Sequence, residues 1–128
     1  MVIDTSAVCA IFFDEPEAER FLDAILAAPA PYFSAVSFVE TSILLDSKKG
    51  SSEKQLRRFL EQAGIEVVPT TPEISFIATG AYRRFGKGNH PAALNFGDVF
   101  SYATAKFLDL PLLYKGNDFA MTDVKPAA

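Results

Sequence analysis

Four carboxylates stand at positions where they could act together in a hydrolytic site. Asp4 and Asp118 each follow a short apolar run that is typical of a buried strand. Glu40 and Asp98 lie in the opening turns of two predicted helices. The only histidine, His90, is interpreted as a loop residue. Because oxygen ligands without histidine or cysteine suit Mg²⁺ or Mn²⁺ better than zinc, metal-assisted hydrolysis is the expected chemistry.

The same acids could instead serve only as helix caps. A carboxylate near a helix N-terminus accepts bonds from free N–H groups and meets the positive end of the helix dipole. A capping box needs a Ser, Thr, Asp or Asn followed three residues later by an acceptor. The positions that fit capping are Asp4, Asp118, the pair Ser37 and Glu40, and the pair Asn95 and Asp98.

Glu40 weakens the capping interpretation. At helical spacing it shares a face with the apolar residues Val36, Ile43 and Leu44. A carboxylate within an apolar stripe is expensive to bury without a partner. Since four acids at one edge would also repel one another, a cation is the simplest partner for the group.

Strands and helices alternate along the chain, which predicts one α/β domain over residues 1–128 with a parallel central sheet of four to five short strands. Helices are expected on both faces, because parallel strands need crossover connections. The predicted strands are 2–3, 32–34, 65–68 and 112–114. The predicted helices are 5–13, 16–27, 36–48 stopped by Gly50, 52–63, 72–84 and 96–108, with a short helical turn after Asp118. Ligands of such sheets bind beyond the carboxyl ends of the strands, where the acids are placed.

Composition narrows the class of protein. The single cysteine, Cys9, excludes an intrachain disulfide and fits the reducing cytoplasm, and it is interpreted as a core residue. The longest uncharged stretch, 24–39, contains two prolines and is shorter than the roughly 20 residues of a membrane-spanning helix, so no membrane partner is expected. The net charge of −4 argues against non-specific nucleic-acid binding, although the basic residues are clustered.

Four motifs resemble the PIN domain, and more narrowly the VapC-type toxins of bacterial toxin–antitoxin systems. They are "MVIDTSAV" at the start, "SAVSFVE" ending at Glu40, "NFGD" ending at Asp98, and "LLYKGNDFAMTDV" near the end. The resemblance covers Met1 to about Val124. It implies a Mg²⁺- or Mn²⁺-dependent endoribonuclease, usually a homodimer, that is held inactive by a VapB-type antitoxin.

Carried over to this chain, the resemblance implies a catalytic acid cluster. Asp4 and Asp98 would hold the metal directly, and Glu40 and Asp118 through water or with a second ion. Many relatives carry an acid where this chain has asparagine at position 117. The fourth position therefore depends on Asp118, with Asp123 as a substitute. The supporting polar residues would be Thr5, Ser6 and Asn95. Asn117 also flanks the acids and could orient them or a metal-bound water.

Partner contacts are also expected. An apolar surplus in the first two helices, including Phe12, Phe13 and Phe21, would form the dimer. Neutralisation would place against the carboxylates either an arginine of the antitoxin, which can bind them in a bidentate fork, or another antitoxin segment that plugs the acidic site. The candidates for phosphate contacts with single-stranded or looped RNA are Arg83, Arg84, Lys87, Lys106 and Lys115.

Three alternative functions compete with the ribonuclease. A receiver-like phosphoacceptor domain would need adjacent acids after the first strand and an aspartate after the third, and "VIDTSA" and "EVVPTT" lack them. A non-catalytic PIN-like binding module would be signalled by a lost metal ligand, for which only Asn117 gives a hint. A PIN nuclease acting on another nucleic acid stays open, since phosphodiester chemistry does not choose the sugar. The sequence does not name the RNA target.

Overall fold

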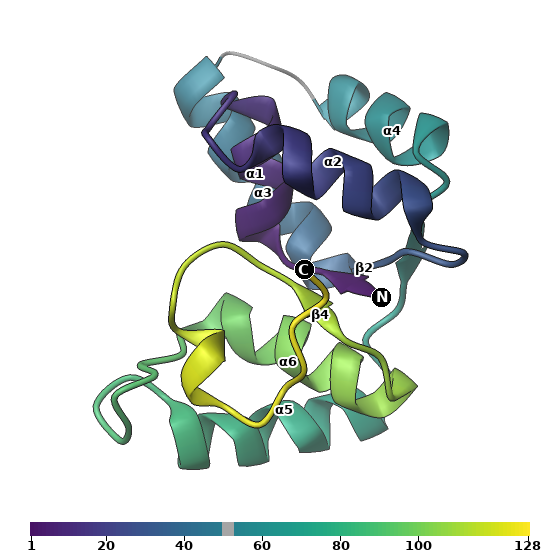
Figure 1. Ribbon diagram of the computed structural model, residues 1–128. Coiled ribbons are helices and arrows are strands. Elements are labelled where there is room, and N and C mark those ends of the chain that lie inside the picture. The colour runs from purple at the N-terminus through teal and green to yellow at the C-terminus, as the bar shows by residue number, and fades with distance from the viewer. Residues whose placement is uncertain (50–52) are drawn as a thin grey trace.

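In the residues that the structure describes, four short strands form one parallel sheet at the centre of the molecule (Figure 1). The structure, a computed structural model, describes residues 1–49 and 53–128. The strands are β1 (Val2–Ile3), β2 (Tyr32–Ser34), β3 (Glu66–Val68) and β4 (Leu112–Leu113), in the order β3-β2-β1-β4. In register, Ile3 lies between Phe33 and Leu113. The residue after β1 is therefore central at the carboxyl edge of the sheet.

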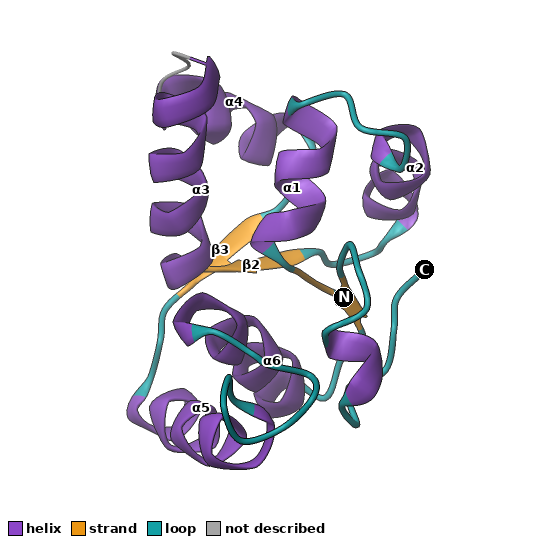
Figure 2. Cartoon of the chain, turned by 90° about the vertical axis from the view of Figure 1, so that its left-hand side faces the viewer, coloured by secondary structure: helices purple, strands orange, loops and turns teal. Residues whose placement is uncertain are grey.

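Helices cover both faces of this sheet, and Figure 2 shows the strands between the two layers. On one face lie α1 (Thr5–Phe12), α2 (Ala18–Ala27), α3 (Ala35–Lys49) and α4 (Glu53–Gln62). On the other lie α5 (Pro72–Phe85) and α6 (Phe96–Leu108). A short 3₁₀ turn, η1 (Phe119–Met121), follows β4. In the described parts of the chain, no helix has the length and apolar character needed to cross a membrane.

Successive residues of a strand pack into two different hydrophobic cores, one on each face of the sheet. Val2 and Leu112 pack with α5 and α6, whereas Ile3 and Leu113 pack with α1, α2, α3 and α4. Alternate side chains of a strand point to opposite faces, so a sheet covered on both sides needs continuous apolar strands. Fully burying one such side chain contributes about 1.5–3 kcal/mol, which allows strands of two residues to hold the edge in place.

Most predicted element bounds are confirmed within two residues. Strands 2–3 and 32–34 and helix 96–108 are reproduced as predicted. The helix predicted from Pro16 begins at Ala18 instead. The predicted start at Ser52 and the stop at Gly50 lie outside the described residues.

The prediction of an apolar dimer surface on the first two helices is wrong for Phe21. Phe21 is fully buried in the core beside α1 and α2. Phe12 and Phe13 are partly buried against the same core, and the Phe12 ring meets Phe59 edge-on at 5.4 Å. These residues are apolar by type, but the sequence alone does not tell which of them face the core. Cys9 is buried, as expected for a core residue.

Candidate active site

Asp4 occupies the centre of the carboxyl edge because it directly follows the central strand β1. Its N–H donates to the carbonyl of Leu113 at 2.9 Å, which continues the ladder with β4. Its Oδ2 accepts a bond from the Ser6 N–H at 3.0 Å, so Asp4 caps α1. The residue is only 3% exposed, and its Oδ1 has no hydrogen-bond partner among the described residues. A buried, unpartnered carboxylate oxygen is costly and indicates a ligand.

Glu40 reaches the same edge from the second turn of α3. Its carboxylate lies against the backbone of Gly97, because a Cβ on Gly97 would come within 2.7 Å of Glu40 Cδ and would overlap the carboxylate oxygens. Gly97 directly precedes Asp98 in α6. The absence of a side chain at Gly97 thus lets the acid of one helix approach the acid of the other.

Asp98 is fixed by a capping box at the start of α6. The Asn95 N–H donates to Asp98 Oδ2 and the Asp98 N–H donates to Asn95 Oδ1, both at 2.9 Å. Burial first, and then the charges of Asp4, Glu40 and Asp118, raise the pKa of Asp98 to about 7. The bond from the Asn95 N–H acts in the opposite direction and lowers it. All three other predicted acids therefore act on this one carboxyl group.

Two of the same carboxylates also affect the pKa of Cys9, which is buried in the core. Burial raises the pKa of the Cys9 thiol to about 11, and the charges of Asp4 and Glu40 raise it as well. A thiol with such a pKa carries almost no thiolate at neutral pH, so it is inert as a nucleophile or ligand. The acids of this edge remain an all-oxygen set.

The PIN domain family profile matches residues 1–125 of this chain. Among curated proteins, Ribonuclease VapC30 of Mycobacterium tuberculosis is 42% identical over 129 residues, which cover 100% of this chain and 98% of the relative. Ribonuclease VapC of Mycolicibacterium smegmatis is 45% identical over 125 residues, or 97% of each protein. The chain is a PIN-domain protein of the VapC ribonuclease family.

Two solved structures share the fold of this PIN domain. VapC20 of Mycobacterium tuberculosis, described as a sarcin-ricin-loop-cleaving toxin, superposes with a TM-score of 0.76 at 17% identity and covers 98% of both chains. A chain of a toxin–antitoxin complex from Klebsiella pneumoniae gives a TM-score of 0.74 at 21% identity, covering 95% of this chain and 92% of that chain. At these identities the likeness establishes the fold alone.

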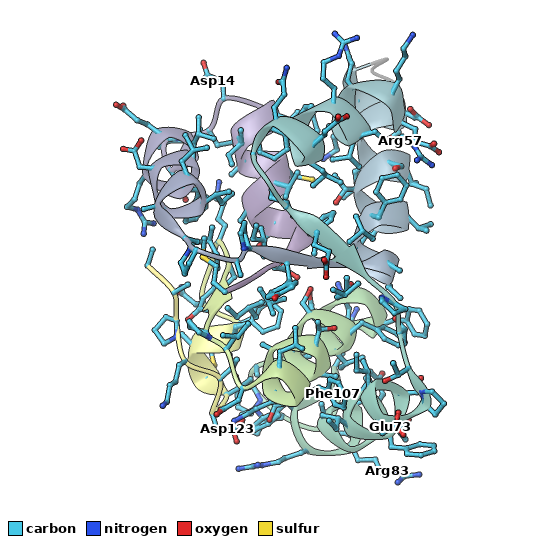
Figure 3. The ribbon with its side chains drawn as sticks, turned by 90° about the vertical axis from the view of Figure 1, so that its right-hand side faces the viewer. Asp14, Arg57, Glu73, Arg83, Phe107 and Asp123 are labelled. Carbon is cyan, nitrogen blue, oxygen red and sulfur yellow. The ribbon has the colours of Figure 1, made fainter. Side chains whose placement is uncertain are left out.

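The PIN domain places Asp118 and Asp123 in different surroundings. Asp118 is exposed after β4, and its charge acts on Asp98. Asp123 accepts a 2.5 Å bond from the Tyr102 hydroxyl and forms an ion pair with Lys106 at 3.1 Å. Figure 3 shows it on the C-terminal segment beside α6. Asp118 is thus the better candidate for the fourth acid, and the substitution by Asp123 is not supported.

Capping and clustering of acids occur together in this PIN domain. Asp4 caps α1 and Asp98 belongs to the capping box of α6, and both are also members of the acid cluster. The alternative capping box of Ser37 and Glu40 is absent, because Ser34 caps α3 by accepting the Ser37 N–H at 2.9 Å. Asp118 precedes η1 without a side-chain capping bond. Glu40 therefore lies inside its helix and has no capping role.

The supporting polar residues have distinct positions. Ser6 holds the edge together, since its N–H donates to Asp4 and its Oγ accepts the Lys115 N–H at 3.0 Å. Thr5 is 5% exposed, and its Oγ1 has no partner among the described residues. Asn95 caps α6 as predicted, and Asn117 is exposed beside Asp118.

Three of the five basic candidates already have acidic partners. Lys115 lies 3.0 Å from Glu15. Lys106 and Arg84 both pair with Asp123, Arg84 at 3.7 Å. The two remaining candidates, Arg83 and Lys87, are exposed near the end of α5 and in the loop that follows it.

The acid cluster fits a divalent cation by its donor set. It offers carboxylate oxygens only, and one buried oxygen of Asp4 lacks a partner among the described residues. As the side chains stand, no group of three or more Asp, Glu, His or Cys in the described residues is gathered tightly enough to hold a metal ion. Like charges repel, so acids without a cation between them are expected to spread apart.

Sequence reasoning missed Gly97 and two buried serines, Ser37 and Ser101. Gly inside a helix costs about 0.5–1 kcal/mol relative to Ala, which signals that something approaches closely. Such a signal was present in "NFGD". The serines gave no comparable signal, because their contact joins residues 64 positions apart.

Proposed function

We propose that this chain is a divalent-metal-dependent endoribonuclease toxin that hydrolyses RNA phosphodiester bonds. The observation that carries the proposal is the convergence of the acids: Asp4 Oδ1 is buried without a hydrogen-bond partner among the described residues, and the Glu40 carboxylate lies against Gly97, the residue before Asp98. Burial and the charges of the three other acids also raise the pKa of Asp98 to about 7, and a bound cation would offset that repulsion. The VapC ribonuclease family supplies the reaction class, and its PIN domains generally depend on a divalent metal.

The proposed roles follow from how each acid is held. Asp4 and Asp98 are oriented by backbone N–H groups and would contact Mg²⁺ or Mn²⁺ directly. Glu40 and Asp118 would contact it through water or hold a second ion. When bound, the ion supplies positive charge for the phosphoryl oxygens and lowers the pKa of a water molecule. Glu40 or Asp118 would accept the proton of the attacking water as the water oxygen bonds to phosphorus in line with the leaving 3′-oxygen. The bond from phosphorus to the 3′-oxygen breaks, this oxygen takes a proton from solvent, and the products carry a 5′-phosphate and a 3′-hydroxyl.

The direct test is incubation of the purified chain with total cellular RNA, with Mg²⁺ and with EDTA, followed by mapping of the new ends. We expect discrete cuts with 5′-phosphate ends in Mg²⁺ only. A matched reaction with single-stranded DNA distinguishes the sugar. Cleavage that survives EDTA unchanged, or ends that carry 2′,3′-cyclic phosphate, would contradict the proposal.

Arg83 and Lys87 are the proposed phosphate contacts that remain exposed. Arg83 lines a groove of about 430 Å³ between α5 and α6 that also contains Tyr82 and Phe96. A cation beside exposed aromatic rings is suited to single-stranded RNA, which is bound by backbone charge and base stacking. We expect Arg83→Ala to raise KM for RNA and leave kcat unchanged.

A homodimer is proposed through an exposed apolar groove along α3, in place of the first two helices, which leaves the α5–α6 groove to RNA. Val39 is 56% exposed and Ile43 is 62% exposed. Both line this mainly apolar groove, which also includes Glu40. An exposed apolar surface of this kind is typical of a protein interface. A second copy seated here would lie beside the acid cluster.

Sedimentation of surface variants tests this dimer. Ile43→Asp should convert the dimer into a monomer at micromolar concentration, because it buries an unpaired charge in the interface. Leu26→Asp on α2 is the matched control, since Leu26 is 61% exposed but lies on another helix. A wild-type chain that sediments as a monomer, or a Leu26→Asp variant that dissociates equally, would contradict the proposed surface.

A VapB-type antitoxin is proposed as the second partner. The structural neighbour from Klebsiella pneumoniae is described as part of a toxin–antitoxin complex. Here the carboxylates of the acid cluster, which form no ion pair within the part of the chain that the structure describes, favour a guanidinium, because it binds carboxylate oxygens through two parallel bonds. The proposed place of action is the cytoplasm, where RNA and antitoxin are both present. Failure of the product of the adjacent reading frame to bind or inhibit the purified chain would contradict this partner.

A further inference from the structure

Three buried hydroxyls form a continuous chain between β2, α3 and α6. Ser34, Ser37 and Ser101 are each 1% exposed. The Ser34 hydroxyl donates to Ser37 Oγ at 3.1 Å, and Ser37 Oγ and Ser101 Oγ lie 3.1 Å apart in a second hydrogen bond. The last bond crosses between α3 and α6, which lie on opposite faces of the sheet (Figure 2).

The three linked hydroxyls lie one helical turn from two of the acids. Ser37 precedes Glu40 by three residues on α3, and Ser101 follows Asp98 by three residues on α6. Residues three apart share a helix face. The two helices are thus joined by a hydroxyl bond close to the place where the Glu40 carboxylate lies against Gly97.

We propose that Ser37 and Ser101 are positioning residues that set the separation of Glu40 and Asp98 for cation binding. The inference rests on the proposed function, and neither serine contacts the cation or the RNA. A hydrogen bond is directional and a buried hydroxyl without a partner is costly, so the pair favours one relative placement of the helices. An apolar contact would allow the helices to slide. Sub-ångström placement matters here, because the acids must converge on one ion.

A Mn²⁺ titration of the purified full chain tests the positioning role without measuring cleavage. Electron paramagnetic resonance detects the ion that remains free. In Ser101→Ala we expect Mn²⁺ affinity to fall roughly 10-fold, as is usual when an outer partner of a metal ligand is lost. Cleavage should show a lower kcat with KM for RNA unchanged. Ser37→Ala removes the same bond and also the one that Ser37 accepts from the Ser34 hydroxyl, so it should lose at least as much affinity, and the double variant should be no worse than Ser37→Ala. Ser101→Cys nearly preserves the side-chain volume, so it replaces Ser101→Ala in the Mn²⁺ titration if the alanine variant does not fold.

Thr104→Val is the matched control. Thr104 is 1% exposed on the same helix, but its hydroxyl donates within the helix to the Phe100 carbonyl. It should bind Mn²⁺ and cleave RNA like the wild type. Equal losses in Thr104→Val, wild-type affinity in Ser101→Ala, or additive losses in the double variant would overturn the positioning role. A wild-type chain that binds no Mn²⁺ would instead overturn the proposed function, and this inference with it.

Discussion

Two carboxylates beside α6 have opposite electrostatic surroundings. Asp98, in its first turn, has a pKa that burial and three further acids raise to about 7. Burial also acts to raise the pKa of Asp123, but bonds from Tyr102 and Lys106 and the charge of Lys106 outweigh it, so its pKa lies below the ordinary value. The chain supplies cations to Asp123 and supplies anions to Asp98. We therefore propose that Asp123 has a structural role and that Asp98 and its neighbours bind a cation from outside.

The largest expected difference between the two regions is in cleavage. Asp98→Asn should lower cleavage by on the order of 10²- to 10³-fold, as is typical when one preorganised charge-stabilising group is lost. Asparagine can still accept the Asn95 N–H, so the capping box and the fold persist. Rates measured on RNA at saturating Mg²⁺ check this, with circular dichroism as the fold control. Asp123→Asn should cut like the wild type. Equal rates for Asp98→Asn and wild type would remove the distinction.

Gly97→Ala should damage the acid cluster without damaging the fold. The added Cβ would overlap the Glu40 carboxylate and displace it. A displacement of about 1 Å can cost on the order of 10²-fold in rate. The fold should tolerate the change, because the atoms met are the flexible end of a side chain. Cleavage and thermal unfolding of the same preparation separate the two effects.

Gly80→Ala on α5 is the control for this substitution. A Cβ on Gly80 would meet nothing within 4 Å. It should therefore leave cleavage unchanged, and alanine in a helix should stabilise the chain by about 0.5–1 kcal/mol. A Gly97→Ala variant that cuts at the wild-type rate would show that Glu40 does not need its place against α6.

Asp123→Asn should have a smaller effect, and on stability. It weakens ion pairs to Lys106 and Arg84 whose carboxylate partner is 43% exposed. Solvent screens such pairs, so the expected loss is about 0.5–1 kcal/mol in the free energy of unfolding. Urea unfolding measures it. No loss of stability, together with loss of cleavage, would place Asp123 in the active site.

The smallest expected effect is a difference in pH dependence. Asp98 holds its proton more tightly in the folded than in the unfolded chain, so metal-free stability should fall as the pH rises from about 4 to about 7. Asp123 shows the opposite sign, and its contribution should be lost as the pH falls below about 4. Urea midpoints at about pH 5 and about pH 8 should converge in Asp98→Asn. Identical pH dependence in variant and wild type would contradict the raised pKa of Asp98.

Much of the frame of the site could be predicted from the sequence because it depends on local signals. Short apolar strands placed Asp4 at the end of β1, and Asn95 with Asp98 matched a capping box that the structure contains. Parallel connection then puts the ends of strands at one edge, whatever the details of packing. The positions of the acids relative to the predicted strands and helices were sufficient to place them at this edge.

The errors concern contacts that sequence spacing does not encode. Ser37 and Glu40 had the spacing of a capping box, but the cap is set by where β2 ends, at Ser34. Asp118 and Asp123 differ in role because the C-terminal segment carries Asp123 to Tyr102 of α6. Ion pairs of the basic candidates and the outward face of an apolar helix are likewise decided by tertiary packing.

Thermal unfolding during Mg²⁺ titration tests most directly whether the acid edge needs an external cation. A ligand that binds only the folded state stabilises it by about 2.7 kcal/mol at a concentration of 100 times Kd. Wild type and Asp123→Asn should both rise in Tm as Mg²⁺ is added, and Asp98→Asn should start at or above the wild-type value and show little rise. A wild-type Tm that Mg²⁺ leaves unchanged, or an equal rise in Asp98→Asn, would contradict the account.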